Sequence, residues 1–272
     1  MEWQYISSKA NSLVVKIAKL KDKKYRKAER LFRFDGVKLF SEAIEKGAHI
    51  EYIFIMESAN EAIKNAVKDA QLDSKVYLLS DEAFNKLTNE QSPEGVITVC
   101  SYLENVEELS DIGLLSAQLS NGTTLILESV RDAGNLGTII RSAKAFSIDN
   151  LIISSDCADI YNPKTVRAAM GALFSQKIAI VDGISTLVKD LRNRGVTVYA
   201  AALDGDAKKL GSFELKLGDA IVIGNEGHGL SNEVIGACDE CIFIPMEIGS
   251  ESLNASIAAS VCMWELYKTK LN

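Results

Sequence analysis

A regular alternation of short apolar runs and amphipathic stretches begins near residue 123 and continues to the C-terminus. No other pattern in the chain restricts the fold so strongly. The apolar runs predict buried strands, and the stretches between them have the periodicity of helices. Strands are predicted at 123–128, 150–154, 177–181, 196–201, 220–224 and 241–244, and helices at 135–146, 163–173, 184–194, 231–237 and 252–268. Such an alternation favours an α/β fold with a parallel sheet covered by helices on both faces.

The 272 residues leave room for a second domain before this region. One long helix is predicted at 5–30, further helices at 60–70 and 81–87 and one beginning at Val37, and strands at 52–56, 76–79 and 95–100. We therefore predict a small α/β/α domain over residues 1–103. Residues 104–120 are polar with weak periodicity and are predicted to be a linker, so the larger domain covers 121–272.

The net charge of −7 hides an asymmetry along the chain. Residues 1–33 contain ten Lys and Arg and three Asp and Glu, which gives them a formal charge of +7 and leaves −14 for the rest. A concentrated basic end on an acidic protein is typical of local contact with a polyanion such as RNA. A solvated basic helix is the alternative interpretation.

The cysteines and the hydropathy of the chain indicate in which cellular compartment the protein is found. The five cysteines are scattered and odd in number, which is typical of reduced thiols. Cys238 and Cys241 have the spacing of half a metal site, but there is no second pair, so no metal is expected. No apolar run reaches the length of a membrane span, and the first residues lack a signal-peptide pattern. We therefore expect a cytoplasmic protein.

Polar residues gather after three of the predicted strands. After the first strand, Asn135 stands at a predicted helix start, where its amide can cap the helix or bind a ligand, and Arg141 follows on the face opposite Leu136 and Ile139. The alternative is an ordinary capped helix with a surface arginine.

The strand at 220–224 runs into a loop that contains Gly224, Gly227 and Gly229 and ends at Ser231, a predicted helix cap. Glycines at this density allow a ligand to approach the backbone closely. Their spacing differs from the G-x-G-x-x-G dinucleotide fingerprint, which argues against a nucleotide-dependent oxidoreductase. His228 lies between two of these glycines. It can be interpreted as a general base or as a loop residue without a catalytic role.

In the last segment, the strand at 241–244 ends at Pro245, a short loop follows, and Ser252 is predicted to cap the final helix. The carboxyl end of a strand that faces a helix N-terminus is a common place for ligands in open α/β sheets. An ordinary capped helix would have the same pattern.

In this order and at this spacing, the three segments resemble the motifs of the SpoU (TrmH-type) branch of the SPOUT RNA methyltransferases. Residues 161–174 extend the resemblance, and residues 27–100 are similar to the L30e-like RNA-binding domain that precedes many members. Ala133 stands where many relatives have Pro, and Glu251 where many have Ser. The resemblance implies a trefoil knot in the C-terminal sheet, S-adenosylmethionine as cofactor, and a homodimer with the active site near its interface.

The resemblance also implies site residues. The expected cofactor contacts are Ala202, Leu203, Gly224, Ile244, Met246, Ser252 and Leu253, and the expected catalytic positions are Asn135, Arg141, Glu226, Ser252 and Asn254. The implied reaction is methyl transfer to a ribose 2′-hydroxyl of RNA, with ribosomal RNA preferred and transfer RNA open. A non-catalytic RNA-binding protein of the same fold is the alternative, although none of these polar residues has been lost.

A guanidinium rarely loses a proton, so Arg141 is expected to hold a phosphate and stabilise the developing alkoxide. Glu226 would orient Arg141 or accept the proton through water, while Ser252 and Asn254 would position the ribose and the cofactor.

Overall fold

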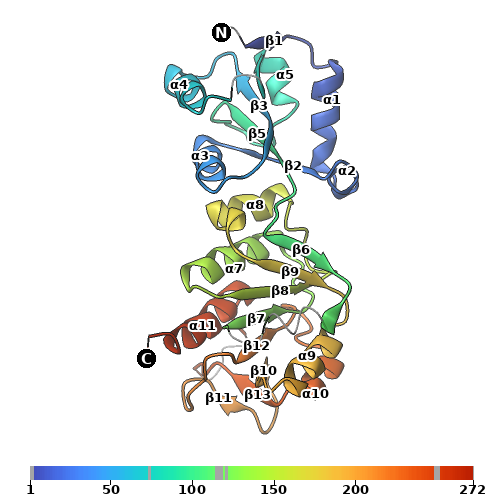
Figure 1. Ribbon diagram of the computed structural model, residues 1–272, viewed down its shortest axis with the longest axis vertical. Helices are drawn as coiled ribbons and strands as arrows, with labels where there is room; N and C mark the ends of the chain where they lie inside the picture. The colour runs from blue at the N-terminus through green and yellow to red at the C-terminus, as the bar shows by residue number, and fades with distance from the viewer. Residues whose placement is uncertain (1–2, 73–74, 114–118, 120–121, 248–251, 272) are drawn as a thin grey trace. The chain divides into compact units, whose positions relative to one another are not determined.

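The computed structural model describes residues 3–72, 75–113, 119, 122–247 and 252–271. The chain divides into two compact units (Figure 1). Unit 1 comprises Met1–Glu104 and Tyr161–Phe174, and unit 2 comprises Asn105–Ile160 and Ser175–Asn272. None of the described helices is long and apolar enough to cross a membrane.

Unit 1 is built on a five-stranded mixed sheet with the order β1-β4-β3-β5-β2. The strands β1, β4 and β3 pair in parallel, whereas β5 pairs antiparallel with both β3 and β2. The strands are β1 (Gln4–Ile6), β2 (Leu31–Asp35), β3 (Ile50–Met56), β4 (Val76–Leu79) and β5 (Val96–Ser101), and the helices are α1 (Ser12–Ala18), α2 (Lys23–Glu29), α3 (Val37–Glu45), α4 (Glu61–Asp69), α5 (Asp81–Asn85) and α8 (Pro163–Ala169).

The single helix predicted at 5–30 is wrong. The segment contains β1, α1, the 3₁₀ turn η1 (Lys19–Lys21) and α2. The side chain of Asn11 accepts a hydrogen bond from the Leu13 N–H and so begins α1, which fixes a break after β1. Arg26 is buried and donates through Nη1 to the carbonyl oxygens of Leu20 (2.8 Å) and Lys21 (2.6 Å), which holds the corner between α1 and α2.

Two members of the predicted basic cluster are therefore structural. Arg26 is 2% exposed and Arg33, on β2, is 3% exposed, so neither guanidinium is available to a phosphate. The cations that remain on the surface of this segment include Lys16, Lys19 and Lys24. Interior arginines cannot be distinguished from surface arginines by counting charges, because burial of the guanidinium appears only in the fold.

Unit 2 is built on an eight-stranded sheet in which every pair is parallel, as the alternation of strands and helices predicted. The order is β11-β13-β10-β12-β7-β8-β9-β6. The strands are β6 (Val106–Leu109), β7 (Thr124–Leu127), β8 (Asn150–Ser154), β9 (Ile178–Val181), β10 (Val198–Ala201), β11 (Lys208–Lys209), β12 (Ala220–Ile223) and β13 (Glu240–Phe243), and the helices are α7 (Ala133–Ala145), α9 (Ile184–Asn193), α10 (Asn232–Ala237) and α11 (Ala255–Lys268).

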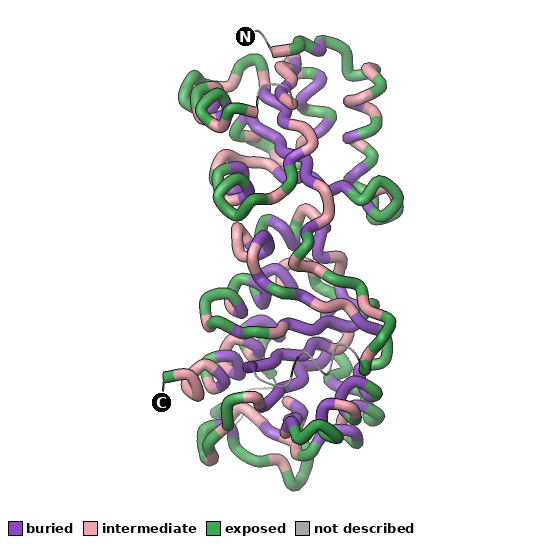
Figure 2. Tube along the Cα trace, viewed as in Figure 1, coloured by how far each residue is buried: buried purple, intermediate pink, exposed green. Residues whose placement is uncertain are grey.

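Helices cover both faces of this sheet, with α9 and α10 on one side and α7 and α11 on the other (Figure 1). Alternate residues of each strand point to opposite faces. Ile126, Ile152 and Val222 form one core cluster with the apolar residues of α9 and α10. The strands in the middle of the sheet are largely buried, whereas the edge strands β6 and β11 contain exposed residues, and further exposed positions gather in the loops and on the outer helix faces (Figure 2).

Two further boundaries differ from the sequence prediction. The expected linker at 104–120 begins with β6, which pairs in parallel with β9 at the edge of the large sheet. The helix predicted at 163–173 ends as α8 at Ala169, because Met170 has a φ of 53° and a 3₁₀ turn, η3 (Met170–Phe174), follows. Both segments lack the long apolar periodicity that makes an element readable from sequence.

Candidate active site

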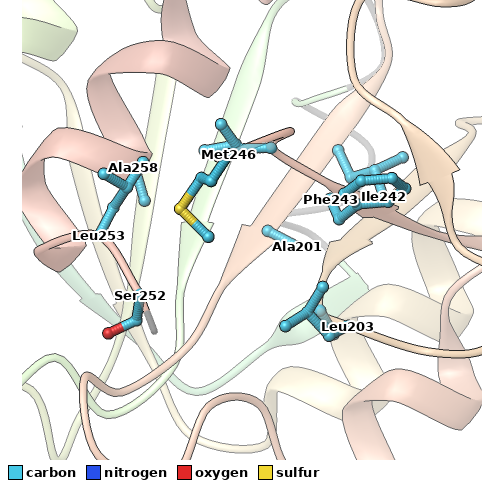
Figure 3. A pocket seen from close by; sticks show the side chains of 10 residues that line it. Ala201, Leu203, Ile242, Phe243, Met246, Ser252, Leu253 and Ala258 are labelled. Atoms are coloured by element: carbon cyan, nitrogen blue, oxygen red, sulfur yellow. The ribbon is translucent and has the colours of Figure 1, made fainter. Parts of the chain in front are cut away.

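A pocket opens at the carboxyl ends of β10 and β13, which are neighbours in the parallel sheet. It has a volume of about 140 Å³ and an apolar wall (Figure 3). Leu253 and Ala258 lie on one side, Ala201 and Leu203 on the other, with Met246 between them. The lining residues are Ala201, Ala202, Leu203, Ile242, Phe243, Ile244, Met246, Ser252, Leu253 and Ala258. A crevice at this edge is the usual ligand site of an open α/β sheet.

Six of the seven residues predicted to contact the cofactor line this pocket, namely Ala202, Leu203, Ile244, Met246, Ser252 and Leu253. The sequence interpretation missed Ala201, Ile242, Phe243 and Ala258. The two strand ends that carry the first three were both predicted, so their place beside the crevice was a signal that could have found them.

Gly224, the seventh residue, is not among the residues that line the pocket. A Cβ built there would lie 2.3 Å from the carbonyl carbon of Gly229 and 2.4 Å from the nitrogen of Leu230. The loop after β12 folds back on itself, and the backbones of Asn225 and Gly229 exchange two hydrogen bonds of 3.0 and 2.9 Å. The missing side chain therefore makes room for the loop's own backbone, which places Glu226 at its tip.

Three of the predicted catalytic residues meet in a hydrogen-bonded cluster, although they come from separate parts of the sequence. The Nδ2 of Asn135 donates to Oε1 of Glu226 (2.6 Å). The Nδ2 of Asn254 donates to Oδ1 of Asn135 (3.0 Å). The helices α7 and α11 pack together beside this cluster, which links the starts of both helices to the loop after β12.

The helix caps differ from the prediction in a way that matters for this cluster. Asp132 caps α7, accepting the Asn135 N–H at 2.8 Å, so Asn135 lies inside the first turn with its side-chain amide available for Glu226. Asn254, rather than Ser252, caps α11 and accepts the Ser256 N–H at 2.9 Å. Both caps are of the residue types that favour this role, and the sequence offered several candidates close together.

A second set of hydrogen bonds joins the loop before α7 to the loop that carries Glu226. Asn225 donates through Nδ2 to the carbonyl oxygen of Ser129 (2.8 Å). The carboxylate of Glu128 accepts the Ser231 N–H (2.8 Å) and the Ser231 hydroxyl (2.7 Å), while that hydroxyl also caps α10. The sequence interpretation assigned no role to Glu128 or Asn225, because their partners lie about a hundred residues away.

Arg141 is on the same helix as Asn135 but outside the cluster. It lies six residues further along α7, about 9 Å along the helix axis. Its side chain is exposed, and within the part of the chain that the structure describes it makes no hydrogen bond or ion pair. The expected pairing of Arg141 with Glu226 is therefore absent here, and Glu226 contacts Asn135 instead. Glu251 lies outside the described residues.

His228 and the Cys238–Cys241 pair stay apart from this chemistry. His228 is an exposed loop residue whose backbone N–H donates to Oδ1 of Asn225 (3.3 Å). Burial raises the pKa of the Cys238 thiol to about 12, so this thiol is a poor nucleophile. Among the residues that the structure describes, no group of three His, Cys, Asp or Glu could hold a metal ion.

The site combines an apolar crevice and a polar cluster at the carboxyl edge of a parallel α/β sheet, an arrangement typical of enzymes that bind a small-molecule ligand. Comparison with known proteins identifies the family. Residues 122–264, more than half of the chain, match the model of the SpoU rRNA Methylase family. Residues 11–98 match the MRM3-like substrate binding domain. The chain belongs to the SpoU rRNA methylase family.

Relatives of the chain share most of its length. It is 28% identical to the 23S rRNA (guanosine(2553)-2′-O)-methyltransferase RlmP of Bacillus subtilis, over 96% of this chain and 98% of the relative. It is 30% identical to the 23S rRNA (guanosine-2′-O-)-methyltransferase RlmB of Coxiella burnetii, over 80% and 87% of the two chains. An AdoMet-bound rRNA methyltransferase structure from Sinorhizobium meliloti superposes with a TM-score of 0.83 at 25% identity, covering 99% of both chains.

Proposed function

We propose that this protein transfers a methyl group from S-adenosylmethionine to a ribose 2′-hydroxyl of ribosomal RNA. The observation that carries the proposal is the cluster of Asn135, Glu226 and Asn254 at the same sheet edge as the apolar pocket. Membership of the SpoU family and the printed activities of RlmP and RlmB support it.

The pocket fits the flat, apolar part of the cofactor. Leu203, Met246 and Leu253 supply hydrophobic contacts of the kind that hold a purine ring. Its volume is below the range of about 300–1,000 Å³ for whole ligand pockets, so it accounts for the adenine end rather than the entire molecule. When bound, S-adenosylmethionine supplies a methyl group that its sulfonium has already activated.

The polar cluster then has the task of holding the ribose and removing the proton. Asn135 orients the carboxylate of Glu226 through Oε1, and within the described chain no hydrogen bond occupies Oε2. This oxygen accepts the 2′-hydroxyl proton, directly or through a water molecule. Arg141 holds the neighbouring phosphate and stabilises the charge that develops on the hydroxyl oxygen. Ser252 lies beside Leu253 and positions the cofactor.

Unit 1 is proposed to hold the RNA. Lys16, Lys19 and Lys24 are exposed on its N-terminal segment, and the match to a substrate-binding domain covers them. Contacts between lysines and phosphates give affinity that falls with salt and carries little sequence information.

We also propose that the protein is a homodimer through α11. Ile257 and Trp264, seven residues apart and thus on one face of the helix, are 53% and 45% exposed. The opposite face, with Ala259 and Met263, is buried, so the helix is apolar on both sides. Trp264 also packs edge-on against Phe146, the residue that follows α7, with ring centres 5.9 Å apart, which extends the apolar surface. Size-exclusion chromatography of Trp264→Glu tests the dimer.

The trefoil knot and the cytoplasmic location remain part of the proposal. The family resemblance supports the knot, and five free cysteines are consistent with a reducing compartment.

Incubation of total RNA with methyl-labelled S-adenosylmethionine tests the function. We expect label in ribosomal RNA at a position that resists alkaline hydrolysis, because a 2′-O-methyl group blocks cleavage of the next phosphodiester. Glu226→Gln, which keeps the hydrogen bond from Asn135 but removes the charge, should abolish the label. Label in transfer RNA, or on a base, would contradict the substrate that we propose.

A further inference from the structure

A hollow of about 350 Å³ lies between α1 and α2 of unit 1, far in the sequence from the methyl-transfer site. Val15 and Lys16 line it from α1, Tyr25 and Glu29 from α2, and Lys19 from the turn between them. Its volume falls within the range of about 300–1,000 Å³ that is typical of small-molecule sites. Its lining combines an apolar floor, one aromatic ring and cationic side chains, a combination suited to a nucleotide.

Tyr25 has no role in the core that would explain an aromatic residue there. It is half-buried and does not belong to the hydrophobic cluster that fills this side of unit 1. Within the described part of the chain, its hydroxyl makes no hydrogen bond. The Nζ atoms of Lys19 and Lys24 lie 5.4 and 5.9 Å from the centre of its ring. Both ammonium groups lie over the ring in cation–π contact. An aromatic ring combined with cationic side chains is the combination that proteins use for base stacking and phosphate contacts with single-stranded nucleic acids.

The surroundings hold Tyr25 in place before any ligand binds. The neighbouring residue, Arg26, is buried and hydrogen-bonded to the carbonyl oxygens of Leu20 and Lys21, so the corner between the two helices is fixed. Glu29 pairs with Lys16 at 2.7 Å across the hollow, and this hydrogen bond raises the pKa of Lys16. A platform that is ordered in advance loses little entropy on binding.

We propose that this hollow binds one unpaired nucleobase of the RNA substrate, stacked on Tyr25, with the adjoining phosphates on Lys19 and Lys24. The proposal rests on the proposed function, since it assumes that unit 1 meets RNA. It assigns this unit a preference for single-stranded segments, because a base held inside a duplex cannot reach the ring. The site therefore distinguishes loops from helices in the RNA, which the surface lysines alone cannot do.

Equilibrium binding to two probes tests this site. The probes are a short single-stranded RNA that carries 2-aminopurine and the blunt duplex of the same sequence, both followed by fluorescence anisotropy with the full-length protein. Tyr25→Ala should weaken binding of the single strand by about 5- to 150-fold, the range for loss of one stacked base. Tyr25→Phe should bind like the wild type and keep the quenching of 2-aminopurine, whereas Tyr25→Ala should lose this quenching.

Matched variants separate stacking from charge and from damage to the fold. Tyr5→Ala removes an exposed tyrosine of unit 1 that lies outside the hollow, and it should leave binding unchanged. Lys19→Ala should reduce the slope of log affinity against log salt by about 0.7 for each phosphate contact that is lost. Tyr25→Leu keeps apolar bulk in the hollow, so it carries the test if Tyr25→Ala does not fold.

Unchanged affinity for the single strand in Tyr25→Ala and Tyr25→Leu would overturn the proposal, as would an equal loss for the duplex. These outcomes do not depend on methyl transfer. A wild-type protein that labels no RNA refutes the proposed function, whereas the binding of 2-aminopurine RNA still decides whether Tyr25 forms a base site.

Discussion

Substitution of Gly224 by Ala tests how the loop with Glu226 is built. The added Cβ would lie 2.3 Å from the carbonyl carbon of Gly229, whereas ordinary contact begins at 3.4 Å. The conflicting atoms are backbone, so the loop itself must move by about 1 Å, since no side chain can rotate away. Overpacking of this kind costs about 1–3 kcal/mol, and we expect the upper end because the loop is closed by its own hydrogen bonds.

Gly236→Ala is the matched control for this prediction. Gly236 lies in α10 of the same unit, and a Cβ there meets nothing within 4 Å. Alanine in a helix is about 0.5–1 kcal/mol more favourable than glycine, so this variant should be slightly more stable than the wild type. Glycine-to-alanine substitution should thus lower the free energy of unfolding at position 224 and raise it at position 236 of the same unit.

Urea denaturation followed by Trp264 fluorescence in a Trp3→Phe background measures unit 2 alone, since the chain has only two tryptophans. Displacement of the loop should also break the contact between Asn135 and Glu226, so the turnover of folded Gly224→Ala should fall well below that of Gly236→Ala. Equal unfolding free energies for Gly224→Ala and the wild type would refute our account of the loop.

Three further predictions concern the site and the C-terminal helix. Arg141→Ala should lower turnover by about 100- to 1,000-fold, the cost of losing one oxyanion stabiliser, and leave S-adenosylmethionine affinity nearly intact. Lys144→Ala on the same helix should behave like the wild type. An equal loss of cofactor binding in Arg141→Ala, measured by calorimetry, would contradict the role of Arg141. Glu226→Gln should lower turnover by about 100- to 10,000-fold without changing thermal stability, as expected for a general base, and near-normal activity would exclude that role. Burial alone would raise the pKa of Asp149, but hydrogen bonds from Lys270 and the Thr123 backbone outweigh it and hold this pKa below its ordinary value of 3.8. The stabilisation is therefore present above this ordinary value and lost as the pH falls through the lower folded pKa, so the gap in thermal stability between the wild type and Asp149→Asn should close in acid.

The sequence contained enough to predict the α/β fold of unit 2 and much of its pocket. Strand–helix alternation is a local signal, and its six predicted strands from 123 onward all occur within two residues of their predicted ends. The pocket residues Met246 and Leu253 follow from the family resemblance, because the motifs place them at strand and helix ends. The knot and the dimer were predicted from the resemblance alone.

What could not be predicted depends on distant partners. Asp132 rather than Asn135 caps α7, and Asn254 rather than Ser252 caps α11 while it also donates to Asn135. Only the contacts of these side chains show which residue has which role. In unit 1, Arg26 counts as a surface charge in the sequence, but it is buried and its hydrogen bonds hold the corner between α1 and α2. A single predicted helix became a strand, two short helices and a turn, because tertiary contacts overrode the local helical preference of this segment.

The membership of Tyr161–Phe174 in unit 1 has a consequence for how the protein is made. These residues bring Tyr161 against Phe32, with ring centres 4.8 Å apart, and Phe174 against Phe34, at 5.5 Å. During translation, residues 1–104 are synthesised before this piece of their core. Unit 1 therefore lacks part of its core until a segment that lies within the sequence of unit 2 has been made, and genetic exchange of either unit requires three crossover points instead of one.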